Sequence, residues 1–444
     1  MSSEWQRTTV EALAAPRPAA LATGPFGSSI AAKYFTHAGV PVIRGSNLSA
    51  DVSTRLIDEG LVFVSDEKAT EFHRSIASRG DLVFTCWGTI NQVGLIDGSS
   101  KYDRYVVSNK QMKLSVDPTK VESQFLYYLF SGPEKQSEIL DNGIGSSVPG
   151  FNLGQLKKHE VLLPPLAEQR QIVAALSSLD TRIALLRKTN ATFEAIAQAL
   201  FKSWFVDFDP VHAKQQGFPP AGMDEATVAL LPDSLELSEL GLVPKGWRAG
   251  SLADLADLNS ESWSARSHPE RIAYVDLANA KDNEIAAAME FAFDDAPSRA
   301  RRVLRSGDTI VGTVRPGNRS FAFVHDPAAT LTASTGFAVL RPRAQESTAY
   351  VYLAATQDSS IEYLAHVADG GAYPAVRPDV VSALACVVPP NAILLMFNAV
   401  ACPLLAKVSA NQVQAQTLTT LRDTLLPRLI SGRLRLPEVE EALG

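Results

Sequence analysis

Residues Leu166 to Trp204 read LAEQRQIVAALSSLDTRIALLRKTNATFEAIAQALFKSW, and this stretch determines the fold that we expect. Apolar or small residues recur in it at steps of three and four, interrupted only by Asn190. They are Ile172, Leu176, Leu179, Ile183, Leu186, Phe193, Ala197, Leu200 and Trp204. A spacing that averages 3.5 residues keeps one stripe facing a partner helix. At about 1.5 Å per residue the helix is roughly 60 Å long, which favours a rigid spacer over a core helix.

A second stripe with this spacing runs from Ile393 to Ile430. Its members are Phe397, Val400, Leu404, Leu418, Leu421 and Leu425, with Lys407, Asn411 and Gln414 in the middle. Pro403 removes one backbone hydrogen bond and should bend the helix. Because neither apolar face is stable when exposed, we expect the two helices to pack on each other. Asn190 and Asn411 are expected to fix the register of the pair.

Short motifs before each helix recur at a nearly constant offset of 225 to 227 residues. The matched pairs are Gly80–Val83 with Gly307–Ile310, Ser108–Lys110 with Ser334–Gly336, Val148–Pro149 with Tyr373–Pro374, and Pro164–Pro165 with Pro389–Pro390. Collinear matches of this kind indicate an internal repeat. Each copy is a domain followed by a long helix, and pseudo-twofold symmetry between the copies makes the two helices antiparallel.

The sequence predicts an α+β fold with two loop-rich domains in tandem pseudo-repeat, separated by two long helices packed as an antiparallel coiled coil. The predicted segments are domain 1–163, helix 164–206, a Pro/Gly-rich acidic linker 207–245, domain 246–390, helix 391–432 and a tail 433–444. In the first domain, strands are expected at Val40–Arg44, Leu61–Val64, Asp81–Thr85, Val93–Ile96 and Gln111–Val116, and helices at Asp66–Ala77 and Val121–Leu129.

Bulk composition sets loose limits on function. A chain of 444 residues is long enough for two or more domains. Its three cysteines form no metal or disulfide pattern, which favours a reducing, cytoplasmic setting. We find no signal sequence and no run of roughly 18 apolar residues, so no membrane partner is expected. The net charge of −7 predicts weak DNA binding by the isolated chain, although much of the acidity lies between Met223 and Leu240.

The helix motifs resemble those of a known family. LPPLAEQRQIVAALSSLDTRIALLRKT and ALFKSWFVDFDP resemble the first helix of the specificity subunit of type I restriction-modification enzymes (the HsdS family), and LLPRLISGRL resembles the end of the second. Shorter matches in the domains include GPFGSSI, PVIRGSNL, GDLVFTCWGT, SNKQ and GSSVPGFNLGQL. The resemblance therefore extends over nearly the whole chain.

This resemblance implies a non-catalytic DNA-recognition subunit with two target recognition domains. Each domain would read one half of a bipartite, asymmetric site in double-stranded DNA, with the helical pair setting the spacing. The implied partners are two methyltransferase (modification) subunits and the restriction or motor subunits of a phage-defence complex. No cofactor is expected in this chain, since S-adenosylmethionine, ATP and Mg²⁺ belong to those partners.

Candidate DNA contacts are polar and basic residues on predicted loops, because Asn and Gln pair with adenine and Arg and Lys with guanine. In the first domain they are Lys33, Arg44, Ser46, Asn47, Trp87, Thr89, Asn91, Gln92, Lys110, Gln111, Ser146 and Ser147. In the second they are Arg266, Arg301, Arg302, Thr313, Arg315, Asn318, Arg319, Ser334, Thr335, Tyr373 and Arg377. The strongest local candidate is the turn from Arg315 to Arg319, which presents two guanidinium groups.

The outward face of the first helix is the expected docking surface for methyltransferase subunits, an assignment that rests on the resemblance. It includes Arg170, Arg182, Arg187 and Lys188.

Neither a catalytic site nor a metal site is predicted. The sequence lacks a Gly-rich phosphate loop with Lys-Ser/Thr, a methyltransferase Pro-Pro-Tyr/Phe motif and a His pair at metal spacing. Asp207 and Asp209 lack a third ligand, so we interpret them as capping or linker residues. The aromatic residues at this junction are interpreted as packing anchors, namely Trp204, Phe205, Phe208 and Trp247.

Two other functions remain open at this point. One is a recognition subunit of a methyltransferase-nuclease fusion system, whose partner would be a single bifunctional chain. The other is a coiled-coil adaptor that binds only proteins and would show no salt-dependent affinity for DNA.

Overall fold

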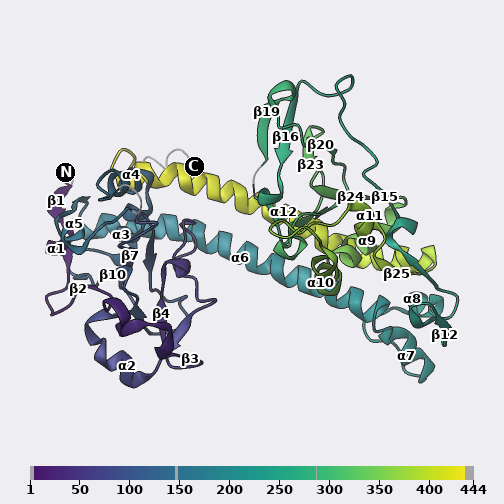
Figure 1. Ribbon diagram of the computed structural model, residues 1–444, viewed down its shortest axis with the longest axis horizontal. Helices are drawn as coiled ribbons and strands as arrows, with labels where there is room; N and C mark the ends of the chain where they lie inside the picture. The colour runs from purple at the N-terminus through teal and green to yellow at the C-terminus, as the bar shows by residue number, and fades with distance from the viewer. Residues whose placement is uncertain (1–4, 146–148, 287, 436–444) are drawn as a thin grey trace. The chain divides into compact units, whose positions relative to one another are not determined.

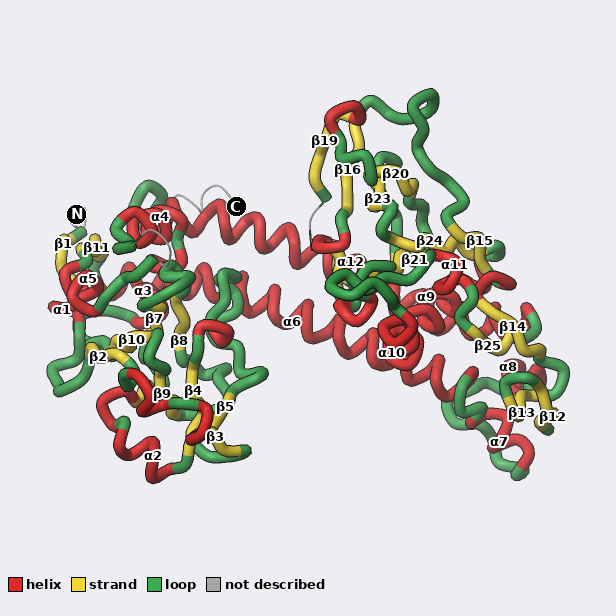
Figure 2. Tube along the Cα trace, in the orientation of Figure 1, coloured by secondary structure: helices red, strands yellow, loops and turns green. Residues whose placement is uncertain are grey.

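The computed structural model describes residues 5–145, 149–286 and 288–435, which fall into two compact units (Figure 1). The first unit comprises Met1–Leu185 and Ala415–Gly444, and the second comprises Leu186–Gln414. Each unit thus combines one α+β domain with part of each long helix. Loops make up much of both domains (Figure 2), as the turn residues between the short strands predict.

Three sheets form the domain of the first unit. They have the strand orders β1-β11, β2-β10-β7-β8 and β3-β5-β4-β9-β6. The strands are β1 (Gln6–Thr9), β2 (Leu21–Thr23), β3 (Phe35–Thr36), β4 (Val40–Ile43), β5 (Val62–Val64), β6 (Ile76–Ser78), β7 (Leu82–Thr85), β8 (Val93–Leu95), β9 (Arg104–Val107), β10 (Gln111–Leu114) and β11 (Glu160–Leu163). Strands β4 and β9 run parallel, whereas the four-stranded sheet is antiparallel.

Short helices complete this domain. They are α1 (Val10–Leu13), α2 (Asp66–Glu71), α3 (Ser123–Ser131), α4 (Pro133–Asp141) and α5 (Leu153–Lys158). Six consecutive residues of α3, from Phe125 to Phe130, are buried, because they share one core with side chains of β7, β8 and α6. The same core includes Ile172 and Leu176 of α6 and Leu426 and Leu429 of α12, so the domain packs directly on both long helices.

The domain of the second unit repeats this plan. Its strands are β14 (Arg248–Ser251), β15 (Ala256–Leu258), β16 (Arg271–Val275), β17 (Ala280–Lys281), β18 (Glu284–Ile285), β19 (Met289–Ala292), β20 (Ala300–Val303), β21 (Thr309–Gly312), β22 (Phe321–Phe323), β23 (Leu331–Ser334), β24 (Phe337–Pro342) and β25 (Ala385–Val388). The helices are α9 (Thr348–Thr356), α10 (Asp358–Val367) and α11 (Pro378–Ser382). The orders β14-β25, β15-β24-β21-β22 and β19-β16-β23-β20 match β1-β11, β2-β10-β7-β8 and β5-β4-β9-β6. With β16 and β23 parallel, as β4 and β9 are, the predicted internal repeat is confirmed.

Secondary structure in the first domain follows the sequence prediction at most elements. The five expected strands coincide with β4, β5, β7, β8 and β10, and the helix expected at Val121–Leu129 is α3. The helix expected at Asp66–Ala77 is wrong in its second half, since α2 ends at Glu71. The chain then forms β6, which pairs with β9. Here tertiary strand pairing overrides the helical spacing.

The first long helix, α6 (Leu166–Phe205), is continuous. In the first unit its buried positions are Gln169, Ile172, Leu176, Asp180 and Ile183, and in the second they are Leu186, Ala197, Phe201, Trp204 and Phe205. Three predicted stripe members, Leu179, Phe193 and Leu200, are only half-buried, and Asp180 and Phe201 take the inner positions beside Leu179 and Leu200. The predicted stripe is therefore confirmed except at these three positions.

The second long helix, α12 (Asn391–Ile430), is also continuous and passes through Pro403. Its buried stripe is Leu394, Phe397, Ala401, Leu405, Val408, Asn411, Ala415, Arg422, Leu426 and Leu429. The predicted stripe was wrong by one residue at most positions, because Val400 and Leu421 are exposed. Lys407 and Gln414 are exposed as well, so the supposed polar middle of the stripe reduces to Asn411.

Within the second unit the two helices pack antiparallel. Asn411 Nδ2 donates to Asn190 Oδ1 at 2.8 Å, and Asn190 Nδ2 donates to the Val408 carbonyl at 3.2 Å. Further along, the rings of Trp204 and Phe397 lie 5.5 Å apart. The two helices therefore run in opposite directions. Asn190 and Asn411, which were expected to fix their register, contact each other.

Residues 207–245 are not an unstructured linker. They contain α7 (Asp209–Gln215), α8 (Glu225–Leu230) and a hairpin of β12 (Leu235–Ser238) and β13 (Gly241–Pro244). Phe208, Val211, Leu231 and Val243 are buried in the core of the second unit. These few apolar side chains pack the Pro- and Gly-rich segment against the domain. The overall composition of the segment does not reveal their packing.

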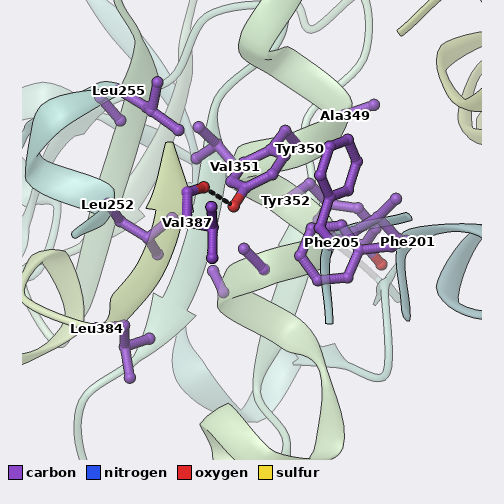
Figure 3. Close-up of a cluster of buried hydrophobic side chains, with 14 of the residues drawn as sticks. Phe201, Phe205, Leu252, Leu255, Ala349, Tyr350, Val351, Tyr352, Leu384 and Val387 are labelled. Atoms are coloured by element: carbon purple, nitrogen blue, oxygen red, sulfur yellow. Dashed lines mark hydrogen bonds between the residues drawn. The ribbon is translucent and has the colours of Figure 1, made fainter. Parts of the chain in front are cut away.

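The core of the second unit contains the predicted aromatic anchors. Trp204, Phe205, Phe208 and Trp247 all belong to it. Figure 3 shows Phe201 and Phe205 of α6 facing Tyr350 of α9, whose hydroxyl donates to the Val387 carbonyl of β25. The ring centroids of Phe205 and Tyr350 are 4.8 Å apart in an edge-to-face arrangement, which joins helix to domain.

One helix contains a window apolar enough to be compared with a membrane span, which our sequence count did not detect. The window lies in α12 and has a mean hydropathy of 1.8, long and apolar enough to cross a membrane by length and composition alone. Leu394, Phe397, Ala401 and Leu405 contribute to this hydropathy, and all four are buried in the core of the second unit. Core helices of soluble proteins pass the same test, so this window is weak evidence for a membrane segment.

Candidate nucleic-acid interface

A groove on the domain of the first unit contains most of the predicted DNA contacts of that domain. The predicted residues that line it are Arg44, Ser46, Trp87, Thr89, Gln92, Lys110 and Gln111. They come from three places that are distant in sequence, namely the end of β4, the loop after β7 and the turn before β10. The residues that sequence reasoning missed in the lining are Ile30, Phe35, Val42, Gly45, Thr85, Gly88, Ser108 and Asn109.

The wall after β4 is held by a short 3₁₀ turn, η3 (Gly45–Asn47). Asn47 is only 1% exposed, and its Oδ1 accepts from the Arg44 backbone N–H at 3.0 Å. Its Nδ2 donates to the carbonyls of Ile57 at 3.0 Å and Glu59 at 3.3 Å. Because these bonds use its amide, Asn47 shapes the groove from inside the domain.

Three buried polar atoms lie in residues that line the groove and have no hydrogen-bond partner in the described structure. They are Thr85 Oγ1, Gln111 Nε2 and Arg44 Nε. Gln111 is fully buried, and the Ser108 hydroxyl donates to its Oε1, which leaves Nε2 unpaired. Arg44 Nη2 donates to the Gly60 carbonyl at 2.9 Å. Unpaired buried polar atoms are costly, and these three lie in residues that line the same groove.

The rim of the groove is exposed and carries positive charge. Lys110 and Thr89 are exposed, and the Trp87 side chain is 51% exposed. Lys33 is also exposed, but it lies outside the groove lining with its ammonium 4.9 Å from the Tyr34 ring. Asn91 is half-buried and likewise outside the lining. Two further candidates, Ser146 and Ser147, lie outside the described residues.

In the second domain, the turn after β21 brings an arginine and a tyrosine together. Arg315 has a left-handed backbone with φ of 48°, and its guanidinium lies 4.6 Å from the centre of the Tyr373 ring. Arg315 Nη2 also donates to the Ala372 carbonyl at 2.8 Å. Tyr373 is 70% exposed. The pair forms an exposed cationic edge of the kind that contacts bases or phosphates.

The other arginine of this turn is already neutralised. Arg319 is ion-paired with Asp282 at 2.5 Å and with Asp358 at 2.8 Å. These two carboxylates hold the pKa of Arg319 above its usual value even though burial acts to lower it. The turn therefore presents one accessible guanidinium, Arg315, where sequence reasoning expected two.

The remaining candidates of the second domain are dispersed. Thr313 and Ser334 are buried; the Thr313 hydroxyl donates to the Gly336 carbonyl at 2.8 Å, and Ser334 Oγ accepts from the Gly336 N–H at 3.2 Å. Both serve the fold. The exposed candidates are Arg266, Asn318, Thr335 and Arg377, the last paired with Asp379 at 2.7 Å.

Two half-buried arginines of β20 make contacts within their own domain. The Arg301 guanidinium lies 4.7 Å from the Phe293 ring and donates to the Ala300 carbonyl. Burial lowers the pKa of Arg302, whose Nη1 donates to Ser262 Oγ at 3.1 Å.

The helix residues predicted to bind partners are exposed. Arg170 in the first unit is ion-paired with Glu122 at 2.6 Å. Arg182 in the first unit and Arg187 and Lys188 in the second also lie on the solvent side of α6. Arg170, Arg182 and Arg187 are sequence neighbours of the buried Gln169, Ile183 and Leu186, so they flank the buried stripe.

Residues 5–145, 149–286 and 288–435 contain no group of three or more His, Cys, Asp and Glu side chains that could hold a metal ion. Cys86, Cys386 and Cys402 are free thiols, and burial raises their pKa values, that of Cys386 to about 11 and that of Cys86 to about 12. Burial therefore disfavours the thiolate form of these cysteines at neutral pH.

Comparisons with known proteins agree with this architecture. Residues 33–195 match the family model of the type I restriction modification DNA specificity domain. The specificity subunit of the type I restriction enzyme MjaIX from Methanocaldococcus jannaschii is 24% identical over 411 residues, covering 92% of this chain and 89% of the relative. That of HindI from Haemophilus influenzae is 25% identical over 387 residues, covering 75% and 82%. The crystal structure of the S subunit of a type I restriction-modification system from M. genitalium has the same fold, with a TM-score of 0.54, 16% identity and 96% of each chain covered.

Proposed function

We propose that this chain, which belongs to the specificity-subunit family of type I restriction-modification enzymes, recognises DNA sequence on behalf of a multisubunit complex. The observation that carries the proposal is the groove in the first unit, where polar and basic residues from three separate loops converge. A groove with the exposed Lys110 at its rim and unpaired polar atoms below suits a base edge between phosphates. The repeat supplies a second domain, and each would read one half of a bipartite asymmetric site.

Catalysis is assigned to the partners of this chain. Two methyltransferase subunits would dock on the exposed face of α6, and restriction or motor subunits would join that complex. S-adenosylmethionine, ATP and Mg²⁺ would be bound by those subunits, and double-stranded DNA would be the shared substrate. We place the assembly in the cytoplasm.

The helical pair would set the length of the unread gap between the two half-sites. Support comes from the continuity of α6 and α12, each 40 residues long, and from the asparagine pair that fixes their register. Inserting about four residues near Arg187 adds roughly one helical turn. We expect the gap to change and the bases of both half-sites to stay the same. An unchanged gap would contradict the ruler role.

The decisive experiment is single-molecule sequencing of methylated bases in cells that express the modification subunit with or without this chain. We expect a bipartite methylated motif that appears only when the chain is present. A methylation pattern that does not depend on the chain would overturn the proposal.

Purification of the complex discriminates among the alternatives. A single bifunctional methyltransferase-nuclease partner would indicate a fusion system, and separate modification and restriction subunits would indicate the type I assembly. A protein-binding adaptor would leave the complex without the steep, salt-dependent DNA affinity that phosphate contacts impose. The groove in the first unit favours the DNA-binding alternatives over the adaptor.

A further inference from the structure

The two domains differ at one equivalent position, and the difference lies inside the groove. Thr85 of β7 pairs with Gln111 of β10 in the first domain, and Gly312 of β21 pairs with Phe337 of β24 in the second. These strands hold the same places in matching sheets. The two polar side chains of the first groove thus correspond to a glycine and a phenylalanine.

A short 3₁₀ turn near this strand pair also differs between the two domains, in its first residue. In the first domain it is η3, which begins at Gly45, and in the second it is η6 (Leu277–Asn279), which begins at Leu277. The two turns are built alike, since Asn47 accepts from the Arg44 N–H and Asn279 accepts from the Asp276 N–H.

Leu277 fills the space that is open in the first domain. A Cβ atom on Gly312 would lie 2.9 Å from Leu277 Cδ2, and one on Gly336 would collide with Leu277 Cδ1. By contrast, a Cβ on Gly45 would meet only Gln111 Nε2, at 3.6 Å. The groove is therefore open and polar in the first domain, whereas its counterpart in the second is closed and apolar.

The lining of the open groove includes several hydrogen-bond donors. Gln111 Nε2 and Arg44 Nε are unpaired, and the Lys110 ammonium stands at the rim. The Thr85 hydroxyl is also unpaired and able to donate. In the major groove, guanine alone presents two adjacent acceptors, N7 and O6, without a donor on the same base. A set of donors at this depth suits that edge.

We propose that this open groove reads a guanine in one half-site, with Lys110 as the direct donor and Arg44 and Gln111 as the floor, while the closed second domain reads from its Arg315–Tyr373 edge. This inference rests on the proposed function of DNA recognition. It assigns the two domains different reading elements, although their folds repeat.

The test transplants the leucine of the second domain into the first. Gly45 lacks the positive φ that would exclude a side chain, so Gly45→Leu is compatible with the backbone and should close the groove. Lys110→Ala removes an exposed donor without touching the core. Lys101→Ala, which removes an exposed cation outside the groove lining, is the matched control.

Each variant is expressed with the modification subunit, and the methylated motif is sequenced. We expect Gly45→Leu to abolish selection in one half-site and Lys110→Ala to weaken the preference for guanine at one position of that half by about 10- to 100-fold. Arg315→Ala should alter the other half, and Lys101→Ala should alter neither.

The outcomes separate this inference from the function on which it rests. A motif that is independent of the chain would overturn the proposed function itself. A chain-dependent motif that Lys110→Ala leaves unchanged, or a wild-type half-site without guanine at the affected position, would overturn the guanine assignment alone. Loss of both halves in Gly45→Leu points to misfolding, and the exposed Lys110→Ala variant then decides.

Discussion

The two units fasten their domains to the long helices with different chemistry. In the first unit, Asp180 of α6 is 2% exposed and lies at the centre of an ionic cluster. Arg422 of α12 reaches its Oδ1 at 3.1 Å, Arg55 of a domain loop reaches Oδ2 at 3.3 Å, and the Tyr128 hydroxyl of α3 donates to Oδ2 at 2.6 Å. One carboxylate thus joins both helices, a domain helix and a domain loop.

In the second unit the corresponding junction uses mainly neutral partners. Glu194 of α6 accepts from the Tyr352 hydroxyl of α9 at 3.0 Å and from Asn283 Nδ2. Gln412 of α12 donates to the Asn283 carbonyl at 2.6 Å. Burial raises the pKa of the Glu194 carboxyl, because only the hydrogen bonds from tyrosine and asparagine offset its desolvation.

The comparison shows that the repeat preserves neither the polar contacts that attach the domain nor their positions on the helices. Arg55 lies in the loop after η3, whereas Asn283 lies in the turn between β17 and β18, which follow the equivalent turn η6. At the 225-residue offset, Asp180 and Arg422 correspond to Leu405 and Ala197, both buried in the second core. An ion pair in one copy therefore occupies the place of an apolar pair in the other.

The largest expected effect comes from breaking the ionic cluster on one side. Arg422→Ala leaves Asp180 buried without its partner on α12, which should destabilise the first unit by about 3–5 kcal/mol. Hydrogen exchange measured by mass spectrometry should show faster exchange in α3 and at the end of α12. Exchange in α9 of the second unit should not change.

Arg428→Ala is the matched control for this variant, since Arg428 is exposed on the same helix. It should change the stability of the first unit by less than about 0.5 kcal/mol. Equal protection in Arg422→Ala and wild type would show that the cluster does not hold the junction.

Replacing both members of the pair should recover much of the loss. Asp180→Leu combined with Arg422→Ala installs the apolar pair of the second unit, and Arg55 keeps Asp97 at 3.4 Å and the Tyr128 hydroxyl at 2.9 Å. Exchanging a buried ion pair for packed apolar residues is often neutral or stabilising. We expect the double variant to be more stable than Arg422→Ala in the same exchange experiment. A double variant less stable than both single variants would mean that the two junctions are not interchangeable.

Removing one hydroxyl from each unit compares the two junctions directly. Tyr128→Phe should cost about 1.5–3 kcal/mol, because that hydroxyl donates to a buried carboxylate that also pairs with two arginines. Tyr352→Phe should cost less, because its bond to Glu194 is longer and the pKa of that carboxyl is raised. The measurement is urea-dependent hydrogen exchange in α3 and α9. A larger effect of Tyr352→Phe would reverse the ranking of the two junctions.

Sequence reasoning found the repeat and the helices, because both leave periodic signals in one dimension. It failed at Asp180 and Arg422. The predicted stripes contain the neighbouring residues Leu179 and Leu421, so Asp180 and Arg422 were expected at the surface. Burial of these residues depends on partners such as Arg55 that are distant in sequence. Each partner is an ordinary loop residue until the fold brings it to the helix, so no local pattern could have revealed the cluster.

The candidate interface was predictable in part for the same reason. Loop residues such as Arg44, Trp87 and Lys110 were found because turn chemistry and polarity identify exposed positions. The closure of the second groove by Leu277 was not predictable, because an apolar residue after a strand is expected to be an ordinary core residue. Likewise the pairing of Arg319 with Asp282 and Asp358 depends on tertiary contacts.

The smallest expected effect is a change in pH dependence confined to the second unit. The pKa of Glu194 is raised from its ordinary value of 4.5, so the folded state holds this proton more tightly than the unfolded state. The resulting stabilisation is full below about pH 4.5 and is lost as pH rises through the folded pKa. Glu194→Gln removes the titration and should flatten this dependence.

The measurement equilibrates the protein in urea at each pH and then labels it by a hydrogen-exchange pulse at one fixed pH. Peptides of α9 report the second unit and peptides of α3 report the first. We expect the urea midpoint of α9 to fall with rising pH more steeply in wild type than in Glu194→Gln, with α3 alike in both. Parallel pH profiles for α9 would show that Glu194 titrates with the same pKa in both states, and the neutral junction would then differ from the ionic one only in geometry.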